Sequence, residues 1–356
     1  MLRLRLIFVF VALAFAAQAQ RQPRKQKEKD PFAVDTTLAY VEYPQRLFVG
    51  YNQALQSYTL RIAPDHDAPF SHRYSSGTKN ISGFEVGYGK LFVSFTVRSV
   101  PNNLARTGGN KFSNVGFNIG SNKWQFEGLY QHHRGFYDAN SPDYNPAYDS
   151  PNPYYRNDAL VVNLLQFKGL YYLNNKHYTV KATQGNNFRQ LRSAVSPIVG
   201  AGFFHLKMRS NQGILNPEIA ALYGKQSLIN SFAAGGATLG GGIAGTFVFL
   251  RKMFLSGTAL IFLEPQLRTY KYLDLPDVRT YNAPLNADVR LTLGFNTADF
   301  YTGVWLSNST RKFYGNELHI KSNLPSAGFS LGFRIKIKKE PKWVQSIKAN
   351  KLYLSI

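Results

Sequence analysis

The chain of 356 residues contains no cysteine. This absence excludes a disulfide framework and a zinc site built on thiolates, and it leaves no residue that could carry a lipoprotein anchor. A fold without such cross-links must be stabilised by backbone pairing and burial. The length suits one large all-β domain or two ordinary domains.

Charged residues are also scarce, and acidic residues are the scarcer kind. Asp, Glu, Lys and Arg make up 17% of the chain, against about a quarter in ordinary soluble domains. The 42 Lys and Arg outnumber the 20 Asp and Glu, which gives a net charge of +22. Such a protein favours anionic partners, and we expect outer-membrane lipid, lipopolysaccharide or an acidic polysaccharide. The scattered basic residues and the export signal described next argue against nucleic acid.

The first apolar run, at residues 6–17, is too short to span a bilayer as a permanent helix. It follows Arg3 and Arg5 and ends in Ala17-Gln18-Ala19, which fits the A-x-A pattern of a cleavage site. We therefore predict a cleaved signal peptide over residues 1–19 and export from the cytoplasm. Residues 20–45 are rich in Lys and Arg, and we expect them to form a solvated periplasmic linker.

From about Leu47 onward, apolar and polar residues alternate with a period of two, which predicts strands with unlike faces. In 288–296, for example, Val289, Leu291 and Leu293 alternate with polar or small residues. Turn residues at 87–90 and 120–122 predict hairpins that join 80–87 to 91–98 and 112–119 to 123–131. Further strands are expected at 56–63, 159–168, 176–183, 197–208, 243–250, 253–271, 299–307 and 328–338, and 351–356 is a candidate closing strand.

These patterns predict the all-β class and an antiparallel transmembrane β-barrel of about 12 strands, in a range of about 10 to 14. The barrel would occupy residues 46–356, with Tyr and Trp near the strand ends and a long external loop at 136–158. A soluble exported sandwich would alternate in the same way and remains an alternative. The apolar stretch at 233–250 contains six glycines, which favour a curved strand over a helix.

Two sets of polar residues are candidates for a functional site. Arg290, Arg334 and Lys336 lie on the polar faces of their strands, and a lumen lined by them would prefer anions. A second set could bind a ligand at the long loop, where we expect the two histidines to form an exposed pair, and it consists of His132, His133, Tyr137, Asp138 and Tyr144.

Other chemical motifs are weak. Gly240, Gly242 and Gly245 match G-x-G-x-x-G, but no helix pattern follows them, so we reject a dinucleotide site. No spacing of Ser and His singles out a catalytic pair. We therefore expect no catalytic residue, no metal and no cofactor.

One central stretch is distinctive. It reads Tyr171-Tyr172-Leu173-Asn174-Asn175-Lys176-His177-Tyr178-Thr179-Val180-Lys181-Ala182, followed by Phe188-Arg189-Gln190 and Ser193-Ala194. With this stretch the chain resembles the uncharacterised Bacteroidetes family called domain of unknown function 4421. The resemblance implies an exported, β-rich protein of outer-membrane type, and it implies no activity and no catalytic residues.

We therefore expect an outer-membrane barrel with a passive role, as a channel or a structural surface protein, inserted by the barrel-assembly machinery. Two alternatives stay open. One is a barrel enzyme that modifies lipid or lipopolysaccharide, and the other is a soluble periplasmic β-domain that binds an anionic glycan.

Overall fold

A computed structural model of the protein describes residues 37–43, 46–64, 69–77, 79–88, 91–100, 107, 109–184, 187–314 and 318–337. The expected signal peptide at 1–19, most of the expected linker at 20–45 and the terminal segment 351–356 lie outside the described residues. Within the described ranges, no helix is both long enough and apolar enough to cross a membrane.

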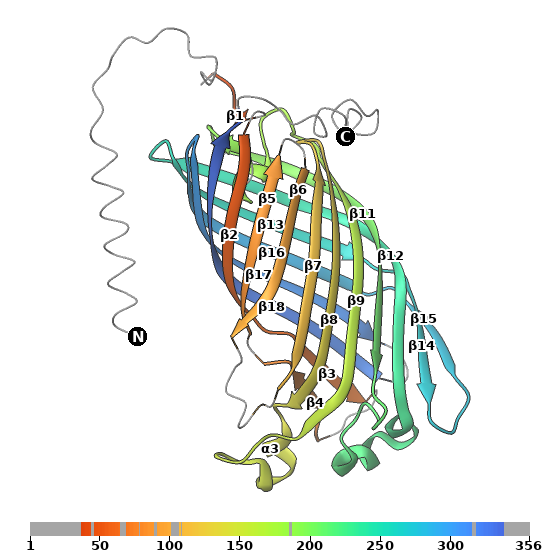
Figure 1. The fold of residues 1–356 in the computed structure, drawn as a ribbon. Helices are drawn as coiled ribbons and strands as arrows, with labels where there is room; N and C mark the ends of the chain where they lie inside the picture. The colour runs from red at the N-terminus through yellow and green to blue at the C-terminus, as the bar shows by residue number, and fades with distance from the viewer. Residues whose placement is uncertain are drawn as a thin grey trace. The chain divides into compact units, whose positions relative to one another are not determined.

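Twelve strands of the described residues close into one antiparallel ring, in which each strand pairs with its neighbours in sequence (Figure 1). The expected barrel is thereby confirmed, as are both predicted hairpins. The order is β2 (Arg46–Gln56), β5 (Lys79–Tyr88), β6 (Leu91–Val100), β7 (Lys111–Gly120), β8 (Trp124–Asp138), β9 (Arg156–Tyr172), β11 (Ala194–Arg209), β12 (Ile229–Phe249), β13 (Met253–Leu263), β16 (Leu285–Asn296), β17 (Phe300–Tyr314) and β18 (Leu318–Lys336). The ring closes where β18 pairs with β2.

Four short strands extend the ring at one end: β3 (Thr59–Pro64), β4 (His72–Ser75), β14 (Gln266–Tyr272) and β15 (Val278–Asn282). β14 continues β13 after a break at Pro265, and β15 precedes β16 before a break at Pro284, because proline cannot donate a ladder hydrogen bond. The single strand predicted at 253–271 is therefore interrupted. β4 pairs with both β3 and β8, so the sheet bypasses β6 and β7 at this end.

The two ends of the barrel differ in their connections. The inner end, where β2 begins, has short turns at 121–123, 250–252 and 297–299 and one long connection, 173–193, between β9 and β11. The outer end has longer connections, with α3 (Ser141–Tyr144) and η1 (Pro146–Tyr148) in 139–155 and η3 (Pro217–Leu228) in 210–228. Bacterial barrels carry short turns on the periplasmic side and longer loops outside, and the labels inner and outer follow that convention.

The alternation along each strand separates an outward apolar face from an inward face. In β16, Leu291 and Leu293 are 50% and 42% exposed on the outer wall, whereas Thr292 between them is buried inside. In β18, Leu331 and Phe333 face outward, and Ser330 faces inward. Outward-facing side chains are apolar on almost every strand of the ring, as a wall in contact with lipid requires.

The glycine-rich stretch is a strand, as predicted, and it lies inside β12. A Cβ atom on Gly240 would lie 2.1 Å from the carbonyl oxygen of Ile261, and one on Gly242 would lie 1.9 Å from that of Ala259. These positions therefore accept only glycine, because the backbone of β13 approaches them too closely for a side chain.

The alternation makes a direct prediction for the outer wall. Leu291→Arg places a charge in the lipid and should lower the free energy of unfolding by roughly 2 to 4 kcal/mol near the bilayer midplane. Thr292→Arg is the matched control, because its side chain enters an interior cavity of about 200 Å³ and should be tolerated. Urea unfolding in lipid vesicles measures both, and equal tolerance of the two substitutions would contradict the membrane barrel.

Candidate functional site in the barrel interior

Charged side chains cross the middle of the barrel interior. Lys168 of β9 forms an ion pair with Asp288 of β16, and the Ser309 hydroxyl of β17 donates to the other Asp288 oxygen over 2.5 Å. On β8, Gln125 Nε2 donates to Glu127 Oε1 over 2.8 Å. The opposite charges of Lys168 and Asp288 compensate each other, which a buried ion pair needs in order to persist.

Two cavities of about 200 Å³ and 170 Å³ lie beside this ion pair. Both are lined by Glu127, Lys168, Asp288 and Ser309. We call them together the polar chamber. The larger cavity has room for about six water molecules, which is too small for a sugar chain or a folded peptide.

The inner end of the interior is filled by the segment that connects β9 to β11. We call its described parts, residues 173–184 and 187–193, the plug. The plug contains η2 (Val180–Thr183) and β10 (Phe188–Gln190), and β10 pairs with β1 (Tyr40–Glu42). The sequence predicted a strand at 176–183, which is wrong: residues 173–177 form turns and Val180–Thr183 form η2, while Tyr178, Val180 and Lys181 are all buried inside the barrel.

Side chains of the barrel wall hold the plug by its backbone carbonyl groups. Asn296 Nδ2 donates to the carbonyl oxygens of Ala182 and Phe188 over 2.8 and 3.1 Å, and the Tyr301 hydroxyl donates to that of Thr183 over 2.8 Å. Lys181 of the plug reaches back to donate to the carbonyl oxygen of Gly120. These bonds satisfy backbone groups of the plug, whose sheet partner among the described residues is β1.

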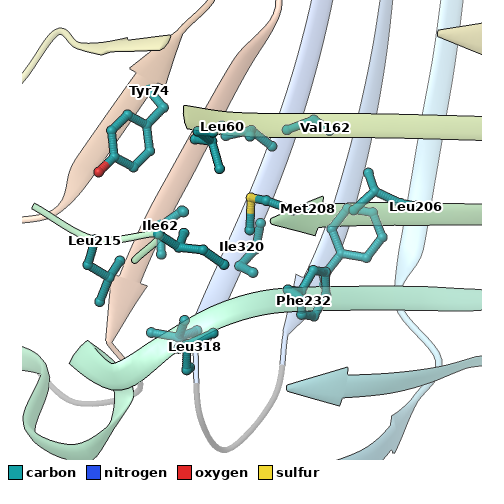
Figure 2. Close-up of a cluster of buried hydrophobic side chains, with 14 of the residues drawn as sticks. Leu60, Ile62, Tyr74, Val162, Leu206, Met208, Leu215, Phe232, Leu318 and Ile320 are labelled. Atoms are coloured by element: carbon teal, nitrogen blue, oxygen red, sulfur yellow. The ribbon is translucent and has the colours of Figure 1, made fainter. Parts of the chain in front are cut away.

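The outer half of the interior is packed with apolar side chains from all sides of the ring (Figure 2). Leu60 and Ile62 of β3 are fully buried, as are Met208 of β11, Phe232 of β12 and Ile320 of β18. Phe232 meets Phe313 at a ring-centroid distance of 5.8 Å. The barrel is therefore filled here in the way that a soluble protein core is filled.

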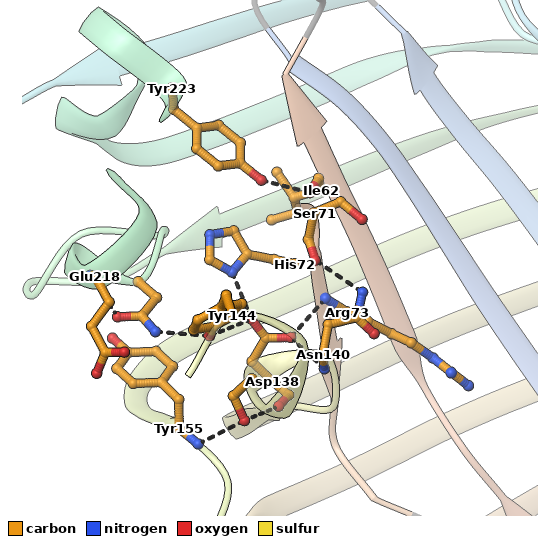
Figure 3. Close-up of polar contacts among 12 residues, drawn as sticks. Ile62, Ser71, His72, Arg73, Asp138, Asn140, Tyr144, Tyr155, Glu218 and Tyr223 are labelled. Atoms are coloured by element: carbon orange, nitrogen blue, oxygen red, sulfur yellow. Dashed lines mark hydrogen bonds and ion pairs between the residues drawn. The ribbon is translucent and has the colours of Figure 1, made fainter. Parts of the chain in front are cut away.

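Asp138 is the centre of a polar cluster at the outer end (Figure 3). Its carboxylate accepts from His72 Nδ1 over 2.7 Å, from the Tyr144 hydroxyl over 3.1 Å and from the backbone N–H groups of Arg73 and Asn140 over 2.8 and 3.0 Å. The side chains of His72 and Asp138 are both 0% exposed. Rings of Tyr74 and Tyr223 stack on the imidazole, with centroids 5.2 and 5.4 Å away.

Tyr144 and Tyr148 of the outer connections are neutral at physiological pH. Burial raises the pKa of Tyr148 to about 12, and its hydrogen bond to Glu218 adds to this shift. Burial also raises the pKa of Tyr144, which lies next to the Asp138 carboxylate. Both hydroxyls therefore remain donors, and the cluster joins residues 139–155 to η3.

The two residue sets suggested by the sequence are placed as follows. Arg290 lies over the ring of Trp305 at 5.3 Å inside the barrel, and buried Arg334 donates to Asn296 Oδ1 over 3.0 Å. Lys336 is exposed at the last position of β18. Asp138 and Tyr144 come together in the outer cluster, whereas the ring of Tyr137 stacks on that of Tyr154, 5.1 Å away.

The expectation of an exposed histidine pair is wrong. β8 continues to Asp138, so both histidines lie in a strand, and its alternation sends them to opposite faces. His133 is buried and stacks on Tyr58 at 4.4 Å, whereas His132 Nδ1 lies 2.7 Å from Asn163 Oδ1 on the other face. No group of three or more His, Asp or Glu within the described ranges could hold a metal ion.

Sequence reasoning did not identify Lys168, His72 or the role of the plug. The alternation at 288–296 placed Asp288 on the polar face of its strand. Lys168 lies 120 positions away at the end of a mainly apolar strand, and no pattern in the sequence pointed to it. His72 stands alone in a short segment, and only the pairing of β4 with β8 brings it to Asp138.

Comparisons with known proteins give a family and a set of loose structural likenesses. The model of the family described as "Domain of unknown function (DUF4421)" matches residues 33–335. No curated protein matches this sequence. Among solved structures, the chain is similar to the outer membrane protease OmpT from Escherichia coli, with 9% identity, a TM-score of 0.38 and coverage of 83% of this chain and 98% of that one.

Two other solved structures are also loosely similar to this chain. The translocator domain of autotransporter NalP from Neisseria meningitidis has 11% identity and a TM-score of 0.37, with 80% of this chain and 88% of that chain covered. The Pseudomonas putida toluene transporter TodX has 9% identity and a TM-score of 0.28, with 82% and 91% covered. The barrel itself is established by its strand pairing and not by these scores.

The outer cluster yields a stability prediction. Asp138→Ala leaves the His72 and Tyr144 donors and two backbone N–H groups without their acceptor, so the free energy of unfolding should fall by about 3 kcal/mol. Asp149→Ala, at an exposed position of the same connection, should stay within about 0.5 kcal/mol of the unchanged protein. Urea unfolding measures both, and a similar result for the two variants would show that Asp138 does not hold the outer end together.

Proposed function

The chain belongs to the DUF4421 family, and from that premise we propose that it is a structural surface protein of the outer membrane and not an open channel. The observation that carries this proposal is the apolar packing of the outer half of the interior. Side chains from β3, β9, β11, β12, β17 and β18 meet there. An ion or a sugar could cross only if these side chains separated, with the loss of their burial energy.

The outer wall supports placement in a membrane. Large apolar side chains are exposed on strands all around the ring, among them Phe84, Ile261 and Phe333 at 61%, 59% and 59%. A soluble periplasmic domain would leave this wall in water, which apolar surface of this extent opposes. Export and the assembly of a closed antiparallel ring fit the outer membrane.

The alternative of a lipid-acting enzyme finds less support. His72 and Asp138 have the geometry of a hydrogen-bonded base and its orienting acid, but both side chains are fully buried between tyrosine rings. A substrate cannot reach them while the cluster is intact. We therefore assign the pair a structural role in joining β4 to β8.

A gated channel is the second candidate, because the polar chamber lies between the plug and the apolar packing. Conductance across a planar bilayer separates the two functions. We expect no conductance steps from the unchanged protein. We also expect none from the double variant Asn296→Ala, Tyr301→Phe, which loses three hydrogen bonds to the plug, because the outer half remains sealed.

A matched control is Tyr281→Phe, which removes the hydroxyl of an exposed tyrosine on β15. A folded barrel is verified by the faster migration of the unheated sample on a gel. Conductance steps in the unchanged protein would contradict the structural role and show that the protein is a channel. Steps that appear only in the plug variant would establish a gated channel.

A further inference from the structure

Four cations stand side by side on adjacent strands at the outer end. Lys312 of β17 pairs with Lys321 of β18, Lys321 pairs with Arg61 of β3, and Arg61 pairs with Arg73 of β4. All four occupy one register row of the sheet. We call this set the basic row.

The basic row lies on the outward face. The residues that flank its members point inward and are fully buried: Leu60 and Ile62 in β3, Ile320 in β18 and Phe313 in β17. The guanidinium of Arg73 extends away from the Asp138 cluster (Figure 3), and only its backbone joins that cluster. Arg61 and Arg73 are exposed at the rim of the apolar wall.

The basic row is unfavourable unless an anion neutralises it. Like charges directly opposite each other on neighbouring strands destabilise a sheet, and neighbouring strands lie only about 4.8 Å apart. Within the described part of the chain, no carboxylate oxygen lies within 4.0 Å of any of the four cationic groups. Lys168 and Arg311 inside the barrel differ in this respect, since each faces a carboxylate.

A second group of outward cations surrounds a pocket of about 760 Å³ on the neighbouring part of the same end. One register row crosses it from Arg134 through Val161, Arg209 and Ser231 to Lys271. Lys207 lines the same pocket. Carboxylates compensate little of the positive charge around this pocket. Asp158 is hydrogen-bonded to Arg156 over 2.7 Å, and Asp277 lies 3.6 Å from Lys271.

We propose that the basic row and this pocket bind the phosphate groups of a phosphorylated glycolipid of the external leaflet, the lipid anchor of lipopolysaccharide. Both sites lie at the loop-rich end, where head groups contact a barrel, and acyl chains would lie along the apolar wall below them. Charge complementarity selects this occupant over a neutral lipid. The proposal rests on the outer-membrane placement proposed above.

A lipid titration of the full-length barrel in zwitterionic detergent tests the proposal, with adducts counted by native mass spectrometry. The probe is a bisphosphorylated acylated glucosamine disaccharide. Arg61→Gln with Lys321→Gln removes the centre of the basic row, and Arg209→Gln with Lys271→Gln removes two pocket cations. Each pair should weaken binding about tenfold or more, since each basic residue near an anionic lipid surface contributes about 1 kcal/mol.

The control pair is Lys123→Gln with Lys252→Gln, which removes two positive charges from turns at the inner end and should leave binding unchanged. The dephosphorylated lipid should bind much more weakly than the probe, and millimolar inorganic phosphate should not displace the probe. Equal binding by the row, pocket and control variants, or equal binding of the dephosphorylated lipid, would overturn the proposal. Displacement by inorganic phosphate would overturn it in favour of a simple anion site.

The failure of this inference can be told apart from failure of the proposed function. Heat-dependent gel migration and flotation with vesicles report whether the protein is a membrane barrel, and neither depends on the cations. A barrel that passes both tests but binds the probe equally in all variants contradicts the lipid site alone. A protein that fails both contradicts the outer-membrane placement itself.

Discussion

Closure of the sheet between β18 and β2 is the constraint on which the rest of the structure depends. A closed ring satisfies the backbone groups of every strand within the ring, so the wall can lie in lipid without an unpaired edge. Closure also gives each strand one inward and one outward face, and successive side chains point alternately to the two faces. Leu291 and Thr292 are neighbours in sequence but are separated by the wall, and the same division fixes where charge can be placed.

Much of this fold could be predicted because the period-two pattern acts locally. The alternation at 288–296 and 328–338 gave the correct faces, and the glycines of 233–250 gave a strand. The pattern fails where a segment is buried on all sides. Residues 176–183 alternate like a strand, but they lie inside the barrel mouth, where hydrogen bonds from Asn296 and Tyr301 replace a sheet partner. The candidate site was less predictable, since partners such as Lys168 and Asp288 meet only after the ring has closed.

The plug coincides with the most distinctive stretch of the sequence. The residues that carry the family resemblance, from Tyr171 to Ala194, include Tyr178, Lys181 and Phe188, which are buried against the barrel wall. Such a segment is more restricted than a strand, because its buried side chains must fit a fixed space while its backbone carbonyls meet particular donors. A channel would need these contacts to break, whereas a structural barrel needs them to last.

The barrel wall divides the cations of this positively charged protein into an interior group and an outward group. Inside the barrel, Lys168 faces Asp288 and Arg311 faces Glu264, so part of the positive charge is compensated there. On the outward face, four further cations stand in one register row in spite of their mutual repulsion. A soluble protein would separate such charges or alternate them with carboxylates. A row of cations at the edge of an apolar wall is stable where anionic lipid head groups surround it, because their negative charges offset the repulsion among the cations.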